Sequence, residues 1–235
     1  MPFAERQTME LPNGERIAYR EREGGEIPVV LLHGNLSSSA VWDVAFERLD
    51  DRFSLYAMEM RGFGESTHET PIDSIEDLAA DVKHFIDGLG LETYSLWGWS
   101  TGAGAAMVVA ADWPAQVQRL VLMAPPSTQG LPFYERDDNG RPTDRVLETR
   151  DELAADPVGV QPAIQALFDE DEAAMRAIWD RSIYYTDDPD EERLSRYVEE
   201  ALKTRHYLDV IYALGHINIS PDDNGIEPGT GDAET

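Results

Sequence analysis

The N-terminal quarter of the chain alternates between short apolar runs and polar turns. Residues 8–23 predict a β-hairpin, because Asn13-Gly14 is a turn dipeptide and the positions after it alternate between apolar and polar. Residues 27–32 form a nearly continuous, β-branched apolar run, which is typical of a strand that is covered on both faces of a parallel sheet. A polar loop at 33–39, a helix at 41–49 and another strand at 53–58 follow.

The middle of the chain contains the clearest helix. Over residues 75–89 apolar side chains recur every three or four positions, and Ser74 with Asp77 forms a capping box for the first turn. Apolar runs at 94–97 and 119–123 predict two more strands, separated by a helix of small residues that ends near residue 111. Strands that alternate with helices predict an α/β protein with a mostly parallel, doubly wound sheet.

The pattern changes after Pro125-Pro126. Residues 130–145 predict an irregular polar segment, whereas residues 147–214 predict acidic helices that prolines interrupt, and residues 220–235 have the composition of a loop. We therefore expect three parts, namely a core at 1–126, a helical cap inserted after the sixth strand at 127–214, and a return loop at 215–235.

The charge of the chain is strongly negative. Its 235 residues include 46 Asp and Glu against 19 Lys and Arg, which gives a formal net charge of −27. Such a field repels phosphate backbones and anionic lipids, so we expect no nucleic-acid partner and no membrane binding. Only two of the basic residues are lysines. This acidic, lysine-poor balance favours a halophilic protein, in which concentrated salt screens the self-repulsion.

The chain contains no cysteine, which excludes disulfides, thiolate metal sites and a cysteine nucleophile. No apolar run reaches the roughly 18 residues that a transmembrane helix needs. The N-terminus lacks a basic start followed by an apolar stretch, so we expect a cytoplasmic protein without a secretory signal.

One pentapeptide carries a chemical signal. Gly98-Trp99-Ser100-Thr101-Gly102 matches G-x-S-x-G and lies between a predicted strand and a predicted helix, which is the context of a nucleophile elbow. There the serine projects from a sharp turn, and the glycines Gly98 and Gly102 avoid collisions across it. The N-terminus of the following helix directs amides toward the group that the serine attacks. We interpret Ser100 as a nucleophile; the alternative is a Gly/Ser loop without function.

A serine nucleophile needs donors for the negative charge that develops on the substrate oxygen. One donor is the amide of Thr101, and the second comes from the loop after the third strand. We assign this second oxyanion donor to the amide of Asn35, with Leu36 as the fallback; a simple turn role for Asn35 is the alternative. We expect His33 to pack within this loop, because the base of this arrangement comes later in the chain.

Three segments resemble the α/β-hydrolase superfamily in order and spacing, most closely its compact members with a helical cap. They are His33-Gly34-Asn35, the Arg-Gly-Phe-Gly-Glu-Ser stretch at 61–66, and the pentapeptide at 98–102. The resemblance is strong over 1–126 and weak over the cap. It implies the α/β-hydrolase fold, an acyl-enzyme route, a small-molecule ester or related substrate, and no cofactor or metal. A serine at position 100 disfavours haloalkane dehalogenases and epoxide hydrolases, which use Asp. We interpret Glu59 as structural.

The resemblance ends after the cap. In this family the acid and the histidine of the triad follow the seventh and eighth strands, and the sequence shows a pattern for neither strand. We therefore expect a C-terminally truncated form that lacks the last two strands. The sequence identifies neither the general base nor the general acid, which are unknown. Five later residues are alternative candidates that the sequence disfavours: His206 as a surface or cap residue, His216 where the cap returns to the core, and Asp137, Asp138 and Asp144 in a solvated loop.

Loss of two strands would leave the sixth strand as an exposed apolar edge, so we expect self-association through that edge. The functional prediction is a serine hydrolase that cleaves a carboxylic ester or lactone through an acyl-enzyme on Ser100, with an incomplete triad. A carbon–carbon bond hydrolase that uses the same elbow is one alternative. A non-catalytic or inactive binding protein with this fold is the other.

Overall fold

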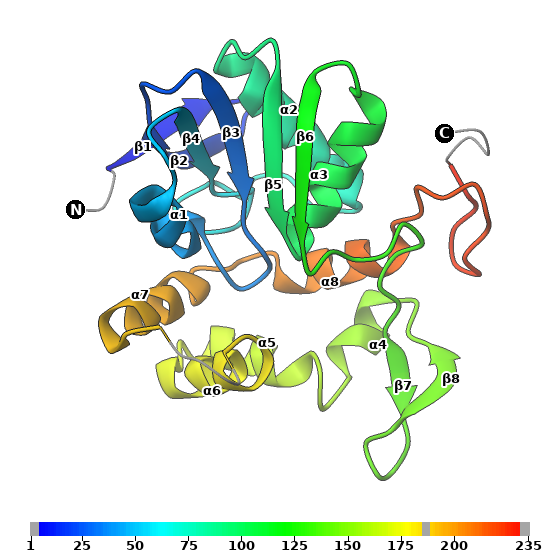
Figure 1. Ribbon diagram of the computed structural model, residues 1–235. Helices are drawn as coiled ribbons and strands as arrows, with labels where there is room; N and C mark the ends of the chain where they lie inside the picture. The colour runs from blue at the N-terminus through cyan, green and yellow to red at the C-terminus, as the bar shows by residue number, and fades with distance from the viewer. Residues whose placement is uncertain (1–4, 185–188, 231–235) are drawn as a thin grey trace.

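A six-stranded sheet with the order β1-β2-β4-β3-β5-β6 forms the centre of the molecule (Figure 1). The computed structural model describes residues 5–184 and 189–230, so residues 185–188 of the predicted cap and 231–235 of the predicted return loop lie outside them. The strands are β1 (Arg6–Glu10), β2 (Arg16–Arg22), β3 (Ile27–Leu32), β4 (Phe53–Met58), β5 (Tyr94–Trp99) and β6 (Val117–Met123). β3 to β6 pair in parallel, whereas β2 is antiparallel to β1 and β4. The predicted mostly parallel α/β sheet is confirmed.

The strands follow the apolar runs of the sequence. β3 and β4 begin and end at the predicted residues, and residues 29–32 of β3 and residues 54, 55, 57 and 58 of β4 are buried. β5 continues two residues beyond its predicted end, to Trp99, and β6 begins two residues early, at Val117. The predicted hairpin turns at Asn13-Gly14, where Gly14 has φ +90°, a value that favours glycine. The extension of β5 matters for function, because it places the helix directly after Ser100.

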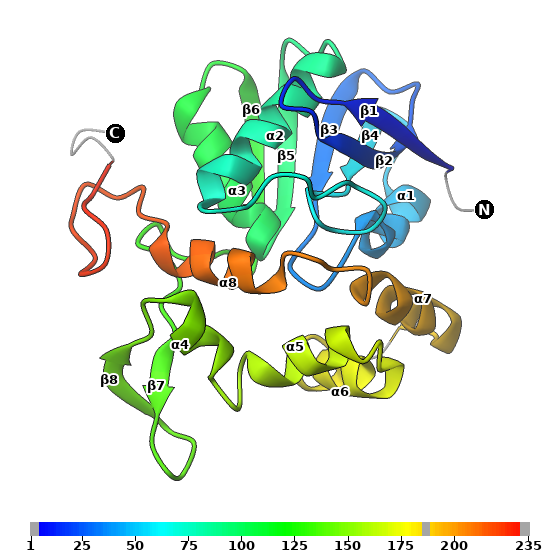
Figure 2. The ribbon, with the colours of Figure 1, turned by 180° about the vertical axis from the view of Figure 1, so that it is seen from behind.

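Helices cover the two faces of the sheet unequally. Two long helices lie on one face (Figure 2), and one short helical segment lies on the other. The long helices are α2 (Ile75–Gly88) and α3 (Thr101–Asp112); the short segment consists of the 3-10 helix η1 (Ser39–Trp42) and α1 (Asp43–Arg48). The capping box of Ser74 and Asp77 is present at the start of α2. The apolar stripe of α2, including Leu78, Val82 and Phe85, packs into the main core.

The segment predicted as irregular contains a second, two-stranded sheet, so that prediction was wrong. β7 (Tyr134–Arg136) and β8 (Pro142–Val146) form an antiparallel hairpin. Its turn contains Asn139-Gly140, with Gly140 at φ +74°, and is closed by the bond from the Asp137 amide to the Arg141 carbonyl at 2.9 Å. The hairpin was missed because its strands are largely polar and exposed, so they lack the alternation that marks a half-buried strand.

In the described part of the chain, five helices follow the hairpin and lie beyond the carboxyl ends of the parallel strands (Figure 1). They are α4 (Arg150–Ala154), α5 (Gln161–Phe168), α6 (Glu172–Ser182), α7 (Glu191–Ala201) and α8 (Tyr207–His216). Most of them share a separate apolar core, in which Trp179 is fully buried and packs against Tyr184 and Tyr197. The aromatic side chains of this region therefore serve mainly to hold the helices together.

Asp43 and helix α8 provide two of the connections that hold these helices to the sheet. Asp43 of α1 is buried and accepts hydrogen bonds from Tyr197, Arg193 and Arg196 of α7. α8 belongs to both cores, because Val210 and Leu214 pack with the sheet while Tyr207 and Ile211 pack with the other helices. Because α8 contributes to both cores, its packing does not test the predicted boundary between cap and return loop at residue 214, which stays a prediction. Among the described residues, no helix combines the length and apolar character that crossing a bilayer requires.

Candidate active site

Ser100 occupies the turn between β5 and α3. Its backbone has φ 52° and ψ −116°, a combination that residues with a side chain rarely adopt. Its amide donates to the carbonyl of Met123 at the end of β6 (2.9 Å), and its carbonyl accepts from the amides of Ala103 and Gly104 in α3. These bonds on both sides hold the strained residue in place, in the sharp strand-to-helix turn that the pentapeptide predicts.

Three glycines allow the backbone to pass close to Ser100. A Cβ on Gly102 would lie 2.4 Å from the carbonyl oxygen of Leu32, and one on Gly98 would lie 2.5 Å from the Cα of Ala103. A Cβ on Gly34 would lie 3.0 Å from the ring of Trp99 and 3.2 Å from the Cβ of Ser100. The loop that follows β3 therefore lies directly against the serine.

Two backbone amides near Ser100 have no partner within the described residues. They are the amides of Asn35 and Thr101, which are the two predicted oxyanion donors. Leu36, the fallback donor, is different, because its amide donates to the Asn35 side chain at 2.9 Å. Leu36 also has φ 51°, so the loop bends sharply at this residue. The geometry thus leaves Asn35, and not Leu36, with an available amide.

His33 is completely buried beneath this loop. Its Nε2 accepts from the amide of Met60 (3.0 Å), so Nδ1 carries the proton and donates to the carbonyl of Gly34 (2.8 Å). Its ring also packs edge-on against Phe63. Burial lowers the pKa of His33 to about 4. His33 is therefore neutral near pH 7 and links the loop to the start of the 60–66 turn, as expected for a packing residue.

The pKa of His33 makes the stability of the protein depend on pH. The unfolded chain takes up a proton at this residue below its ordinary pKa of 6.5, whereas the folded chain does so only near 4. Stability is therefore lost as the pH falls through this interval, by about 2 kcal/mol between about pH 7 and about pH 5. We expect His33→Asn to remove this part of the pH dependence, measured as the difference between variant and wild type in urea unfolding. An unchanged pH dependence would contradict the assignment.

His206, which the sequence predicts to be a surface or cap residue, lies within the predicted cap and is largely buried. It is the N-cap of α8, and its side chain is only 13% exposed. Its Nδ1 lies 2.7 Å from Oδ2 of Asp209, and its buried Nε2 has no hydrogen-bond partner. Asp209 also binds Arg150, at 2.8 Å. Asn35 contacts the same segment, through a bond to the carbonyl of Tyr207. Within residues 5–184 and 189–230 this is the only histidine paired with a carboxylate, and its His-x-x-Asp spacing was the available sequence signal.

The other candidates for an acid or a base lie elsewhere. His216 is the last residue of α8; its ring stacks on Tyr212 at 3.9 Å and its Nδ1 lies 2.8 Å from the Tyr212 carbonyl. Asp137, Asp138 and Asp144 are exposed residues of the β7–β8 hairpin, which projects away from the sheet (Figure 1). In the described part of the chain, none of these residues and no histidine forms a hydrogen bond with the hydroxyl of Ser100.

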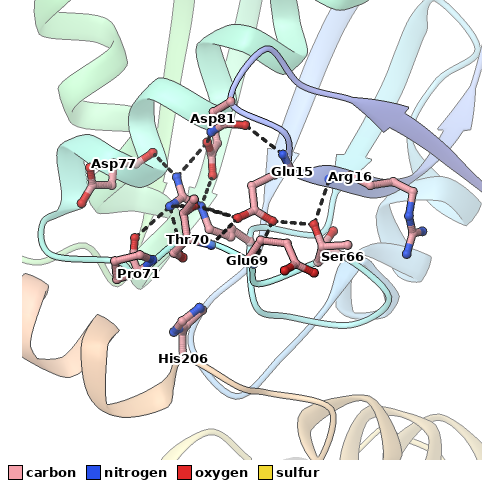
Figure 3. A network of polar contacts seen from close by, with 12 residues as sticks. Glu15, Arg16, Ser66, Glu69, Thr70, Pro71, Asp77, Asp81 and His206 are labelled. Carbon is pink, nitrogen blue, oxygen red and sulfur yellow. Dashed lines mark hydrogen bonds and ion pairs between the residues drawn. The ribbon is translucent and has the colours of Figure 1, made fainter.

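A buried ion cluster holds the 60–71 loop beside the site (Figure 3). Arg61 binds both carboxylate oxygens of Asp81 (2.8 and 2.9 Å) and donates to the Thr70 hydroxyl and the Pro71 carbonyl. Glu15, fully buried, accepts from the amide and hydroxyl of Thr70. Burial by itself raises the pKa of Glu15, but these and neighbouring hydrogen bonds outweigh it, and the net pKa is lowered. Glu15 therefore stays ionised, and the hydrogen bonds of the cluster fix the loop.

Glu59 precedes the same loop, and its contacts fit the structural interpretation. It is fully buried and accepts from Arg6, from the hydroxyl of Ser39 and from the amide of Glu65. These bonds join the N-terminal strand, the oxyanion-loop region and the 60–66 turn. The carboxylate is thus fully occupied by protein groups.

The sheet, the elbow and the loop after β3 together define the class of this protein. The family model described as "alpha/beta hydrolase fold" matches residues 27–213, and the chain belongs to that family. Among curated relatives, it is 30% identical over 181 residues to an N-formylmaleamate deformylase of Pseudomonas putida, covering 73% of this chain and 63% of the relative. It is also 35% identical over 104 residues to a pimeloyl-[acyl-carrier protein] methyl ester esterase of Nitrosomonas europaea, covering 44% of this chain and 39% of that protein.

Solved structures agree on the fold. An esterase from Exiguobacterium antarcticum superimposes with a TM-score of 0.67 at 19% identity, covering 91% of this chain and 74% of the esterase. At this identity the similarity concerns the fold. The chain spans less than two thirds of the length of the two curated relatives above.

Proposed function

We propose that this chain is a serine hydrolase that attacks small carboxylic esters or lactones with Ser100. The Ser100 oxygen adds to the substrate carbonyl carbon and loses its proton, and the alcohol group then leaves with a proton. Water releases the acid from the resulting acyl-enzyme. The amides of Asn35 and Thr101 hold the carbonyl oxygen while it carries negative charge.

The observation that carries this proposal is the strained backbone of Ser100 beside two unpartnered amides. A non-glycine residue is held at φ 52° at some cost in energy, and such strain persists where the surrounding structure enforces it, commonly at active sites. The relatives support the same chemistry, because one is named a deformylase and another a methyl ester esterase. Both names describe hydrolysis at a carbonyl carbon, the atom that a serine nucleophile attacks.

The proton of Ser100 has no acceptor side chain in direct contact among the described residues. Acylation then depends mainly on the two amides, and oxyanion stabilisation with binding alone gives a residual acceleration of roughly 10³–10⁴ over water. We therefore expect slow acylation whose rate rises with pH, as the serine hydroxyl loses its proton more readily.

The test is covalent labelling with a fluorophosphonate probe in about 2 M KCl, which screens the charge of this acidic chain. We expect labelling of the wild type and none of Ser100→Ala, with the modified residue located by mass spectrometry of the tryptic peptide. Ser195→Ala is the matched control, since Ser195 is an exposed serine on α7, and it should label like the wild type.

Each result has a clear meaning. A folded wild type that does not react, even at alkaline pH, would refute the proposal and favour the non-catalytic binding protein. Labelling that persists in Ser100→Ala would place the nucleophile elsewhere. If Ser100 reacts, turnover of ester and lactone substrates but not of a ring-fission diketone would exclude the carbon–carbon bond hydrolase.

A further inference from the structure

The oxyanion loop, residues 33–36 after β3, is held by the core at its start. The carbonyl of His33 accepts from the amide of Gly102 in the first turn of α3 (3.0 Å), and His33 itself is completely buried. The end of the loop, Asn35 and Leu36, instead contacts the helices that follow the hairpin. The amide of Asn35, which we assign as an oxyanion donor, thus lies between a part of the loop that the core holds and a part that contacts these helices.

The side chain of Asn35 forms hydrogen bonds in two directions. Its Nδ2 donates to the carbonyl of Tyr207, the first residue of α8 (3.4 Å). Its Oδ1 accepts from the amide of Leu36 (2.9 Å). The side chain therefore ties the loop to α8, and it occupies the Leu36 amide, which would otherwise be another free donor beside that of Asn35.

Leu36 anchors the same end of the loop through its side chain. It is 8% exposed and belongs to the apolar core of the helices, together with Tyr207 and Ile211 of α8. Its backbone is held at φ 51°, a left-handed conformation that is costly for a leucine. Such a conformation persists where the surroundings enforce it. Burial of the Leu36 side chain in this core and the bond to Asn35 supply that constraint, so the bend of the loop depends on α8.

We propose that α8 sets the position of the oxyanion donor, and that the side chains of Asn35 and Leu36 are the positioning residues through which it acts. The inference rests on the proposed function. Each side chain acts through the backbone of the loop, and not through contact with the substrate. A donor stabilises the oxyanion only when it lies close to the place where the charged oxygen forms. Release of the loop from α8 should therefore slow acylation and leave the preceding binding step intact.

The first test separates the rate of fluorophosphonate labelling from the affinity of the probe, in about 2 M KCl. We expect Asn35→Ala and Leu36→Ala to lower the maximal labelling rate by on the order of 10- to 100-fold, and to leave the concentration of probe that gives half of that rate unchanged. Leu153→Ala is the matched control for Leu36→Ala, because Leu153 is a buried leucine of the same apolar core, on α4 beside the β7–β8 hairpin (Figure 1). It should label at the rate of the wild type.

Hydrogen–deuterium exchange provides a second readout that does not require a reaction at Ser100. The Leu36 amide should exchange about 5-fold faster in Asn35→Ala than in the wild type, after correction for the intrinsic rate of each sequence, because it loses its hydrogen bond. The amides of α3 should exchange as in the wild type. Circular dichroism of each variant confirms folding before the rates are compared.

The outcomes separate this inference from the proposed function. If the wild type labels, and Asn35→Ala and Leu36→Ala label as fast, α8 does not position the donor. Leu153→Ala labelling as slowly as Leu36→Ala would also overturn the proposal, since loss of packing anywhere in this core would then suffice. A folded wild type that does not label refutes the proposed function instead. Exchange then decides whether α8 holds the loop, and an unchanged rate at Leu36 in Asn35→Ala overturns that coupling.

Discussion

Arg61→Met should lower the free energy of unfolding by about 3–5 kcal/mol, the usual result of removing one partner from a buried ion pair. Arg61 and Asp81 are both buried, and the guanidinium binds both oxygens of the carboxylate. Among the described residues, Asp81 would then keep only the bond from Asn13, and Glu15 would lose the guanidinium that lies 4.0 Å away. Asp81 would then be a buried carboxylate without its cation, and Glu15 would keep only its hydrogen bonds, so the variant must unfold more easily. Guanidinium unfolding followed by tryptophan fluorescence gives the value.

The matched control for Arg61 is Arg145→Met. Arg145 also binds two carboxylates, those of Glu135 and Glu152, but its side chain is 51% exposed. Exposed pairs contribute about 0–1 kcal/mol, so this variant should unfold almost like the wild type. Arg61→Lys should recover only part of the loss, because an ammonium cannot bind both carboxylate oxygens in the planar geometry of arginine. If Arg61→Met and Arg145→Met lowered the free energy of unfolding equally, burial would not explain how much the Arg61 cluster contributes to stability.

The contrast between these arginines shows what the sequence can and cannot predict. Local patterns predict two strands and one capped helix, at Ile27–Leu32, Phe53–Met58 and Ile75–Gly88. In each, the buried positions are apolar residues that are close together in the sequence. The partners of Arg61 include residues at positions 15, 70 and 81, and no local sequence pattern joins these three positions. A buried ion cluster depends on the tertiary arrangement. The sequence motif at 61–66 therefore predicts the loop but not the ion cluster that holds it in place.

The candidate site divides in the same way. Ser100, Thr101 and the glycines could be placed from the pentapeptide, because a strand-to-helix turn is a local structure. The packing of His33 also followed from its position in the loop. By contrast, the sequence did not predict the pairing of His206 with Asp209, although its spacing is local, because His206 was interpreted as a surface or cap residue. The β7–β8 hairpin was missed for a related reason, since its strands are polar and exposed.

Gly102→Ala is expected to damage both the fold and the reactivity of Ser100. The added Cβ would lie 2.4 Å from the Leu32 carbonyl oxygen and 2.5 Å from that of His33, and both atoms belong to the backbone where β3 enters the oxyanion loop. Overpacking of this kind costs about 1–3 kcal/mol. The loop and α3 must separate, which also breaks the bond from the Gly102 amide to the His33 carbonyl. A displacement of roughly 1 Å at a reacting centre lowers rates on the order of 10²-fold, and fluorophosphonate labelling should fall accordingly.

The same substitution at Gly215 separates this close approach from a general effect of alanine. Gly215 lies within α8, and the nearest atom to an added Cβ is the Leu131 carbonyl oxygen at 3.9 Å, an ordinary contact. Alanine favours the helix over glycine by about 1 kcal/mol, so Gly215→Ala should stabilise the protein and leave labelling unchanged. The two variants therefore predict opposite changes in unfolding free energy from one chemical change. If Gly102→Ala also stabilises the protein and labels normally, the elbow does not need its glycine, and the tight contact between the oxyanion loop and α3 does not position Ser100.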